Sequence, residues 1–415
     1  MAIDLTVNTA IRTLRRRTAE FIRDAVVPAE LAMLAGPGTP DDALRIRLQR
    51  AARAAGVFAP TVPAALGGLG LDLRGQSVVL EEAGYSLLGP LAMNCAAPDE
   101  GNMHLLEMIA TQRQRERYLE PLATGAIRSC FAMTEPPPGA GSDPGQLATT
   151  ARRSGQGWLI EGRKWFATGA DGAAFAIVMA RTGGTAGAPE ATMFLIPADT
   201  PGFRLTRHVP ALDSAFVGGH GEIELTDCHV GDAALLGQAG KGFAYAQVRL
   251  APARLTHCMR WIGLARRAHT IALEYVHGRT AFGNRLGELG MAQQLIADNE
   301  IDLAASRALI REAAWLVDTG GSGRHETSIA KTFVAEAVGR IVDRSVQLCG
   351  ASGISGDLPL SAYLREVRAF RIYDGPSETH RWSIAKRALR RHAHAVPAPA
   401  STTSAESAHS TPTEG

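Results

Sequence analysis

The stretch RIYDGPSETHR, residues 371–381, lies near the end of the chain and holds the residue on which the interpretation of the sequence depends. One short carboxylate, Asp374, stands between an aromatic residue and a glycine, and a second carboxylate, Glu378, follows four residues later. Asp374 is either a catalytic base or a β-turn aspartate whose side chain bonds its own backbone. The choice depends on the fold that the rest of the chain predicts.

This stretch closes a region of helical periodicity that runs from about residue 244 to residue 392. Apolar residues recur there at helical spacing in two long stripes. The first stripe contains Trp261, Leu264, Ala265, Ala268, Ile271 and Tyr275, and the second contains Leu303, Leu309, Ile310, Ala313, Leu316 and Val317. Long amphipathic helices of this kind pack against one another, so we predict a helical bundle over 244–392.

Two regions of different periodicity precede the bundle. Residues 128–243 contain short apolar or alternating runs such as FAIVMAR and TMFLIPA, separated by glycine and proline, and predict a β-domain. Residues 1–127 predict a helical domain, with helical runs at 41–55, 74–87 and 101–119. The fold class is therefore α+β with several domains. Residues 393–415 are small, polar and proline-containing, and we predict a disordered tail there.

Composition excludes several classes of function. Charged residues are 20% of the chain and the net charge is +2, so no strong field points to nucleic acid or an anionic membrane. We expect a small-molecule partner. No apolar run approaches the roughly 20 residues of a membrane span, and no signal-peptide core follows the N-terminal arginines. We therefore expect a cytoplasmic protein without a membrane span.

Metal sites and the common nucleotide folds are also not indicated. The five cysteines are widely spaced and form no CxxC pair, which predicts neither a disulfide framework nor a zinc site. His392 and His394 have ligand-like spacing, but no third ligand lies near them in the sequence, so we predict no metal. The glycine-rich stretches lack the GxGxxG pattern between a strand and a helix, which argues against a Rossmann or P-loop enzyme.

Six motifs, taken together, resemble the acyl-CoA dehydrogenase family in order and spacing over about residues 10–392. They are FAMTEP (131–136), GAGSD (139–143), GRKWFATGA (162–170), RTAFG (279–283), QLCGASGIS (347–355) and RIYDGPSETHR (371–381). Three further stretches, at 94–106, 218–225 and 249–265, resemble the branch whose larger members carry an added phosphotransferase-like domain. We see no segment of that kind in these 415 residues and carry over no kinase activity.

The resemblance implies a helical N-terminal domain, a middle β-barrel and a C-terminal four-helix bundle. It implies FAD between the barrel and the bundle, and a homodimer or homotetramer. The implied reaction is α,β-dehydrogenation of an acyl-CoA thioester in fatty acid metabolism, with electrons passed to an electron-transfer flavoprotein. That chemistry needs a base for the α-proton, hydrogen bonds to the thioester oxygen, and a flavin to accept hydride, because no side chain accepts hydride.

Asp374 matches the position of the family's most common base, a glutamate that precedes glycine. Some relatives instead keep the base just before the residue that matches Arg254, but Ala253 occupies that position here. Aspartate is one methylene shorter than glutamate, and its carboxylate falls back by roughly 1.5 Å, which matters for proton transfer. Glu378 is the reserve candidate for the base, and it matches a position that contacts flavin or solvent.

The resemblance also assigns residues to the cofactor and to the substrate. The flavin ring would contact Phe131, Met133 and Thr134, with Phe166 and Thr168 behind it. The FAD pyrophosphate and adenosine would be held by Arg279, which comes from the neighbouring subunit, and by Phe282, Gln347, Gly350 and Gly353. Ser142, Arg254 and Gly375 would line the acyl-CoA channel, in a chain whose TEPPPGAGSD loop is longer than the family's usual loop by two prolines.

Three alternatives stay open at this point. One is a dehydrogenase that acts on acyl groups attached to a carrier protein in a biosynthetic pathway. Another is an oxidase or monooxygenase of the same fold that uses oxygen. The third is an interaction protein without flavin, in which Phe131 and Met133 are ordinary barrel packing.

Overall fold

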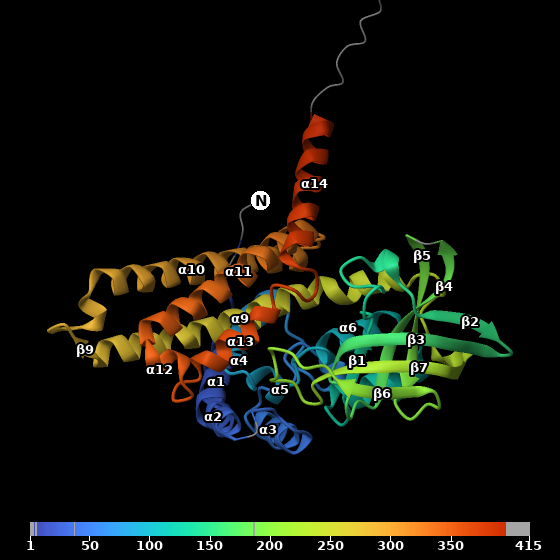
Figure 1. Ribbon diagram of the computed structural model, residues 1–415, viewed down its shortest axis with the longest axis horizontal. Coiled ribbons are helices and arrows are strands. Elements are labelled where there is room, and N and C mark those ends of the chain that lie inside the picture. Colours follow the sequence, from blue (N-terminus) through green and yellow to red (C-terminus); the bar gives the residue numbers. More distant parts are fainter. Residues whose placement is uncertain (1–3, 5, 37, 186, 396–415) are drawn as a thin grey trace, which may run out of the picture.

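The computed structural model describes residues 4, 6–36, 38–185 and 187–395, and Figure 1 shows its helical and β regions following one another along the chain. The N-terminal helices are α1 (Thr9–Phe21), α2 (Val27–Ala35), α3 (Asp42–Ala54), α4 (Leu73–Ala83), α5 (Gly89–Ala92), α6 (Asp99–Ile109), α7 (Gln112–Gln114) and α8 (Glu120–Ala123). Asn8, Asp41 and Asp72 begin α1, α3 and α4, because each side chain accepts a hydrogen bond from a first-turn N–H group.

The middle region is an eight-stranded sheet with the order β6-β7-β3-β2-β4-β5-β8, and β1 pairs in parallel with β4. The strands are β1 (Ser129–Ala132), β2 (Thr150–Ser154), β3 (Gly157–Thr168), β4 (Phe175–Thr185), β5 (Ala188–Pro197), β6 (Phe203–His208), β7 (His220–Gly231) and β8 (Leu235–Leu236). No hydrogen-bonded pairing joins β6 to β8 in the described strands, so the backbone ladder of the expected barrel is open along that edge.

Both faces of β4 are covered, which explains its continuous apolar sequence. Phe175, Ile177 and Met179 belong to the core that is shared with the helices, whereas Ala176 and Val178 belong to a separate core inside the sheet. Successive side chains of a strand point to opposite faces, so this alternation places one face of β4 toward the helical regions. The sheet is therefore anchored to the helices by apolar packing.

The C-terminal region is helical and follows one long helix, α9 (Gly242–Gly278), which begins two residues before the predicted boundary at 243/244. A hairpin of β9 (Thr280–Ala281) and β10 (Asn284–Arg285) connects it to α10 (Gly290–Asp318). The chain continues through α11 (Arg324–Cys349), α12 (Ala351–Ile354), α13 (Leu360–Ala369) and α14 (Ser377–Ala395). Figure 1 shows α9, α10 and α11 lying side by side, while α14 starts beside α11 and runs away from them.

The helix α14 extends through Ala395, so the first three residues of the predicted disordered tail, 393–395, are helical. The rest of that prediction, residues 396–415, lies outside the described residues. The exposed large apolar side chains of α14 include Trp382 and Leu389.

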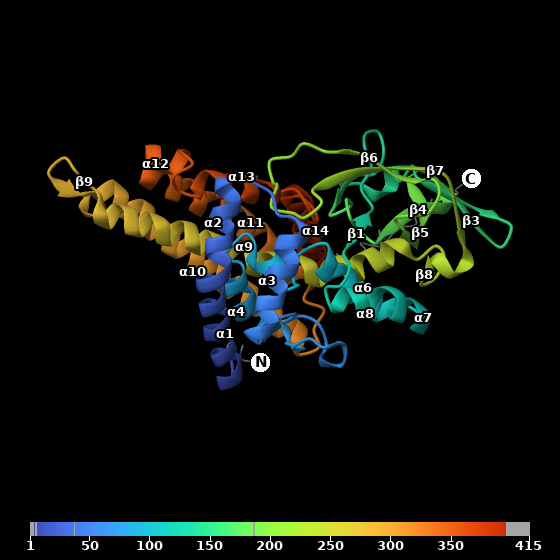
Figure 2. The ribbon, with the colours of Figure 1, turned by 90° about the horizontal axis from the view of Figure 1, so that it is seen from below.

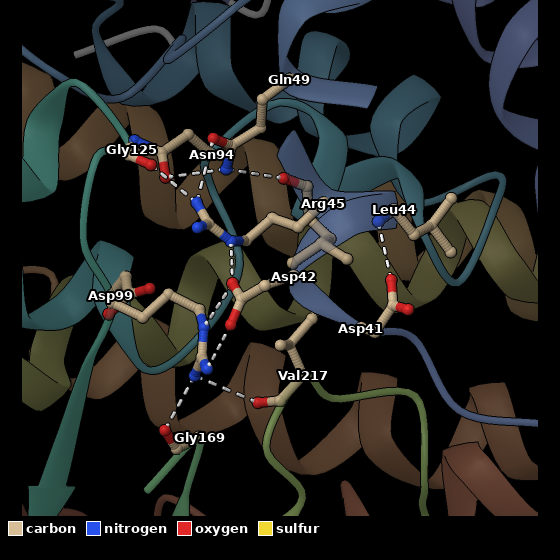
Figure 3. Close-up of polar contacts among 12 residues, drawn as sticks. Asp41, Asp42, Leu44, Arg45, Gln49, Asn94, Asp99, Gly125, Gly169 and Val217 are labelled. Carbon is tan, nitrogen blue, oxygen red and sulfur yellow. Dashed lines mark hydrogen bonds and ion pairs between the residues drawn. The ribbon is translucent and has the colours of Figure 1, made fainter. Parts of the chain in front are cut away.

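An ion pair between a buried arginine and a half-exposed aspartate fixes the N-terminal helices to the sheet (Figure 3). The Asp42 carboxylate on α3 accepts hydrogen bonds from Arg128 at 3.0 and 2.8 Å. The same guanidinium donates to the carbonyl oxygens of Gly169 and Asp171 at 2.9 and 2.7 Å. Arg128 therefore holds the loop after β3 against α3, at the point where all three regions meet.

Candidate functional site

A cavity of about 90 Å³ lies at the meeting point of the three regions. Its walls are largely apolar, with Leu87 and Leu91 from the N-terminal region and Trp261 and Leu264 from α9. The polar side chains that reach it include Asp99, Arg128, Thr168, His257 and Glu366. An enclosed apolar space with a few polar groups is the usual form of a small-molecule site.

The turn that carries Asp374 has an unusual backbone. Asp374 and Gly375 have φ values of +55° and +96°, in the left-handed region that most residues avoid. A Cβ atom on Gly375 would lie 2.9 Å from Nε2 of His380, so the position requires glycine. The turn is fixed by its carbonyl groups: Asp374 O accepts from Arg254 Nε at 2.8 Å, and Gly375 O accepts from Lys331 Nζ at 2.8 Å.

The Asp374 side chain points toward α9, and its Oδ2 atom lies 3.2 Å from Nε2 of His257. No backbone N–H group of the described residues bonds to this carboxylate, which argues against the β-turn alternative. Burial raises the pKa of Asp374, but the hydrogen bond from His257 and the charges of Arg249 and Arg254 outweigh it and hold the pKa below its ordinary range. Asp374 is therefore an ionised carboxylate beside the cavity.

Arg249 is a buried positive charge in the same place. Its Nε atom donates to Asn102 Oδ1 at 2.7 Å, and its guanidinium carbon lies 4.0 Å from the centre of the Phe131 ring. Burial lowers the pKa of Arg249, and the carboxylate of Asp374 opposes that change. Arg249 thus links the β1 strand electrostatically to the Asp374 turn.

Two of the four lysines are completely buried in and next to this site. Lys331 donates to the carbonyl oxygens of Phe370 and Gly375, at 2.9 and 2.8 Å, and burial lowers its pKa to about 8. Lys164 donates to Met133 O at 3.1 Å and to Glu135 Oε1 at 2.7 Å, and burial lowers its pKa to about 8 as well. Both lysines hold backbone segments that carry predicted site residues.

The five residues predicted to contact the flavin ring lie on two neighbouring segments, at the exits of β1 and β3. Trp165 N donates to Thr134 O at 3.0 Å and joins the segments. Phe166 is 41% exposed in a left-handed conformation, and Thr168 Oγ1 lies 3.0 Å from His220 Nδ1. The structure therefore brings these residues together: Phe131, Met133, Thr134, Phe166 and Thr168.

The residues predicted to hold the pyrophosphate and adenosine are elsewhere. Arg279 and Phe282 lie in the hairpin after α9, where Phe282 is 91% exposed. Gln347, Gly350 and Gly353 lie around the α11–α12 junction. Figures 1 and 2 both show the hairpin and α12 toward one end of the molecule and the sheet toward the other. Within one chain, this group does not converge with the flavin-ring group.

Two predicted site residues face outward. Ser142 is exposed in the loop that follows Glu135, and the Glu135 carboxylate holds this loop by accepting from the N–H groups of Ala140, Ala148 and Thr149. The Glu378 side chain is 77% exposed and lies 3.9 Å from Arg381. Of the two carboxylates predicted as the base, Asp374 and Glu378, only Asp374 lies next to cavity-lining residues, namely Tyr373 and His257.

The sequence analysis did not assign His257, Arg249, Lys331 or Arg260 to the site. A signal for His257 exists, because it follows Arg254 by three residues and so shares its helix face. Buried polar residues in an otherwise apolar helix are a second signal. For Lys331 this second signal could show that the side chain is buried, but not that its partners are carbonyl groups of a distant segment.

Among the described side chains, no group of three or more His, Cys, Asp or Glu residues could hold a metal ion. None of the helices in residues 4–395, apart from the positions left out, is long and apolar enough to cross a membrane.

Comparisons with known proteins match all three regions to one family. Residues 8–126, 130–228 and 240–389 match the models described as the N-terminal, middle and C-terminal domains of acyl-CoA dehydrogenase. The chain is 41% identical over 328 residues to "Probable acyl-CoA dehydrogenase FadE2" of Mycobacterium tuberculosis, an alignment that covers 78% of this chain and 80% of that protein.

Two further relatives add to this result. "Acyl-CoA dehydrogenase family member 11" of Gallus gallus is 35% identical over 82% of this chain, but the chain spans only 44% of that protein. A solved structure of "a putative acyl-CoA dehydrogenase from Mycobacterium abscessus" is 36% identical, with a TM-score of 0.87 over 93% of this chain and 100% of the other.

Proposed function

The chain belongs to the acyl-CoA dehydrogenase family, and on that premise we propose that it oxidises the α,β-bond of an acyl-CoA thioester with FAD as its cofactor. The observation that carries the proposal is the Asp374 carboxylate. It is ionised, nearly buried, and flanked by two cavity-lining residues, Tyr373 and His257. Its position matches the chemistry of a base that removes a proton from a bound substrate.

The exits of β1 and β3 fit the flavin ring. Phe166 offers an exposed apolar face, and the Thr134 hydroxyl makes no hydrogen bond to any described residue. An apolar surface beside a free hydroxyl group suits a flat ring with polar edges. We assign the ring to Phe131, Met133, Thr134, Phe166 and Thr168, and assign Glu378 to the cofactor's outer edge.

The exposed hairpin end fits the other half of FAD. Arg279 and Phe282 are exposed in the hairpin, and Gly350 is open as well, since a Cβ atom added to it would meet no atom within 4 Å. We infer that Arg279 and Phe282 serve the neighbouring subunit of a homodimer or homotetramer, together with Gln347, Gly350 and Gly353. An arginine and glycine N–H groups suit a diphosphate.

The chain's own residues account for the proton transfer. Asp374 takes the α-proton, and its own backbone N–H group is available to the thioester oxygen. Arg254 holds the Asp374 carbonyl, and Lys331 holds that of Gly375, so the base keeps its place. A substrate that covers the carboxylate removes its remaining water, and loss of hydration raises the basicity of a carboxylate. Bound FAD supplies the acceptor for the β-hydride.

Three finer assignments belong to this proposal. Ser142 and Gly375 lie with Arg254 along the path to the acyl-CoA. The electrons pass to an electron-transfer flavoprotein, and the protein works in the cytoplasm. The small overall charge, +2, fits a small-molecule substrate and leaves no role for nucleic acid.

The test is a screen of acyl-CoA thioesters of different length and branching for anaerobic bleaching of the flavin. We expect at least one thioester to bleach the yellow enzyme within its turnover time. The same acyl groups attached to a carrier protein are tested in parallel. Bleaching by these thioesters alone would show that the substrate is a carrier-protein thioester and not an acyl-CoA. A purified protein that is colourless and contains no extractable FAD would refute it.

The reaction of the reduced enzyme with air tests the electron acceptor. We expect slow reoxidation by oxygen and fast reoxidation by an electron-transfer flavoprotein. Rapid reoxidation in air, followed by stopped flow, would instead assign the protein to the oxidases or monooxygenases of this fold.

A further inference from the structure

His257 lies between the Asp374 carboxylate and a buried chain of charged groups. Its Nε2 atom is 3.2 Å from Asp374 Oδ2, and its Nδ1 atom is 3.1 Å from Arg260 Nη2. Arg260 also donates to Cys95 O at 2.8 Å and lies 3.6 Å from the Glu100 carboxylate. All these side chains are buried or nearly so. The contacts therefore form a continuous line from α6 through α9 to the Asp374 turn.

The contacts fix which nitrogen of His257 carries the proton. A guanidinium has only donors, so the Nδ1 atom that faces Arg260 must accept. The proton of a neutral imidazole then sits on Nε2, where it is donated to Asp374 Oδ2. Burial and the charge of Arg260 lower the pKa of His257, which agrees with the neutral form. The charged and polar groups around the ring are Arg260, Glu100, Asp374 and Tyr373, with Arg249 and Arg254 on the far side of Asp374.

The two oxygens of Asp374 have different surroundings. Oδ2 is occupied by His257, whereas Oδ1 accepts no hydrogen bond from the described residues. Partial rotation about χ2, which is a soft torsion in aspartate, would otherwise turn the plane of the carboxylate and change the direction in which its second oxygen points. A single N–H donor on one oxygen removes that freedom without blocking the other.

We propose that His257 is a positioning residue for the base: its Nε2–H group holds Oδ2 of Asp374 and leaves Oδ1 to meet the substrate. This assignment rests on the proposed function for its effect on catalysis, and on the contacts alone for its protonation state. It explains how the shorter side chain of aspartate is held in one orientation at a position where the family commonly has glutamate.

The chain contains a matched control on the same helix. His269 is buried, accepts at Nδ1 from the Asn299 amide at 3.2 Å, and lies with Nε2 3.0 Å from the Glu300 carboxylate. It repeats the arrangement of His257 about 18 Å farther along the helix, at 1.5 Å per residue. His269→Leu therefore removes the same kind of contact away from the base.

The kinetic test compares His257→Leu, His257→Gln and His269→Leu in the FAD-loaded enzyme. We expect His257→Leu to lower the rate of flavin bleaching by about tenfold with little change in substrate affinity. The acid limb of its pH–rate profile should move up by about one pH unit, because the base loses a hydrogen bond to its charged form. His257→Gln, which retains an N–H donor, should recover part of the rate. An unchanged acid limb in His257→Leu would overturn the assignment.

The spectroscopic test needs no substrate and uses the wild-type protein labelled with ¹⁵N-histidine. We expect the His257 signal, assigned by its loss in His257→Leu, to show a neutral Nε2–H ring from pH 5.5 to 8.5. The signal should move in Asp374→Asn, while that of His269 stays in place. An Nδ1–H ring, or titration near the ordinary pKa of about 6.5, would overturn the inference. If no thioester bleaches the wild-type enzyme but these spectra hold, the proposed function fails and the protonation state assigned to His257 stands.

Discussion

The two groups of predicted site residues differ in how completely one chain builds them. The inner group surrounds Asp374, where Arg254, His257 and Lys331 each make a defined contact with the turn. The outer group, at the hairpin and the α11–α12 junction, presents an exposed arginine and a Phe282 that is 91% exposed. The residues of the inner group contact one another within one chain, whereas residues of the outer group are exposed to solvent in one chain.

This difference indicates which mutations should change the rate of the reaction and which should change the binding of the cofactor. A buried residue with several contacts affects the site of its own chain, and its loss leaves unpaired groups behind. An exposed residue on a hairpin tip makes few contacts within its own chain, so replacing it removes few of them. Changes in the inner group should therefore slow catalysis, and changes in the outer group should weaken cofactor retention.

The largest effect is expected from Asp374→Asn. Asparagine keeps the size and the backbone but removes the base, so substrate-dependent bleaching should fall by about 10²-fold or more with the yellow FAD retained. Asp374→Glu is the companion variant, which we expect to remain active with a different preference for acyl length. Full activity of the asparagine variant in stopped flow would remove Asp374 from its role.

Lys331→Met should have the next largest effect. It leaves the carbonyl groups of Phe370 and Gly375 without their buried donor, and each unpaired group costs about 1–3 kcal/mol. We expect a lower melting temperature and a loss of bleaching rate of about tenfold, since the turn that holds the base is freed. Lys386→Met, at an exposed lysine of α14, is the control and should match the wild type in both measurements.

Arg279→Ala should act on the cofactor and not on the base. We expect FAD to bind about tenfold more weakly after dialysis and titration, because a charge-assisted contact to the diphosphate is lost. The bleaching rate at saturating FAD should stay within a factor of about two. Arg285→Ala, on the same exposed hairpin, is the control. If Arg279→Ala bound FAD fully but bleached slowly, Arg279 would act in catalysis, and the assignment of the outer group to cofactor binding would be wrong.

Glu366→Gln should change how stability depends on pH. Burial raises the pKa of Glu366 from its ordinary 4.5 to about 7, while its carboxylate still accepts the N–H groups of Ser214 and Ala215. The favourable contribution of the protonated form is fully present below pH 4.5 and is lost as pH rises through 7. The glutamine variant should therefore melt a few degrees higher than the wild type at pH 8, on the order of 2–4 °C. The two proteins should melt alike at about pH 4.5, and a constant difference between them would contradict this origin.

The smallest effect is expected from Glu378→Gln. Its exposed side chain lies near Arg381 at 3.9 Å, and exposed pairs contribute about 0–1 kcal/mol. The bleaching rate should change by less than about twofold, since the carboxylate does not face the cavity. A loss comparable to that of Asp374→Asn would instead make Glu378 the base.

The periodicity of the sequence was sufficient for the order of helical and β regions, because each depends on local spacing of apolar residues. The runs predicted at 41–55 and 74–87 correspond to α3 and α4, whereas the run at 101–119 is divided into α6, α7 and a π-helical turn at Arg115–Leu119. The direction in which α14 runs was not predictable, because local spacing predicts a helix but not what the helix packs against. Trp382 and Leu389 of α14 are exposed in the described chain. The open edge between β6 and β8 was missed for a related reason: pairing between distant strands leaves no trace in local spacing.

The site followed a similar rule. Motif positions led to Asp374, Arg254 and Gly375, and the structure shows that Arg254 donates to the carbonyl group of Asp374, the residue before Gly375. His257 and Lys331 were not predicted as site residues, because their roles depend on contacts between residues that lie far apart in the sequence. The backbone reason for glycine at 375, a φ of +96°, also required three dimensions.

The burial of Lys164 and Lys331 has a practical consequence for labelling this protein. Within the described residues, the exposed lysine side chains are Lys241, at the start of α9, and Lys386, on α14. Among the described lysines, an amine-reactive crosslinker or dye will therefore attach at these two sites. Lys241 lies beside the sheet and Lys386 lies on α14, so each crosslink or label at a described lysine can be assigned to one of two distinct places in the fold.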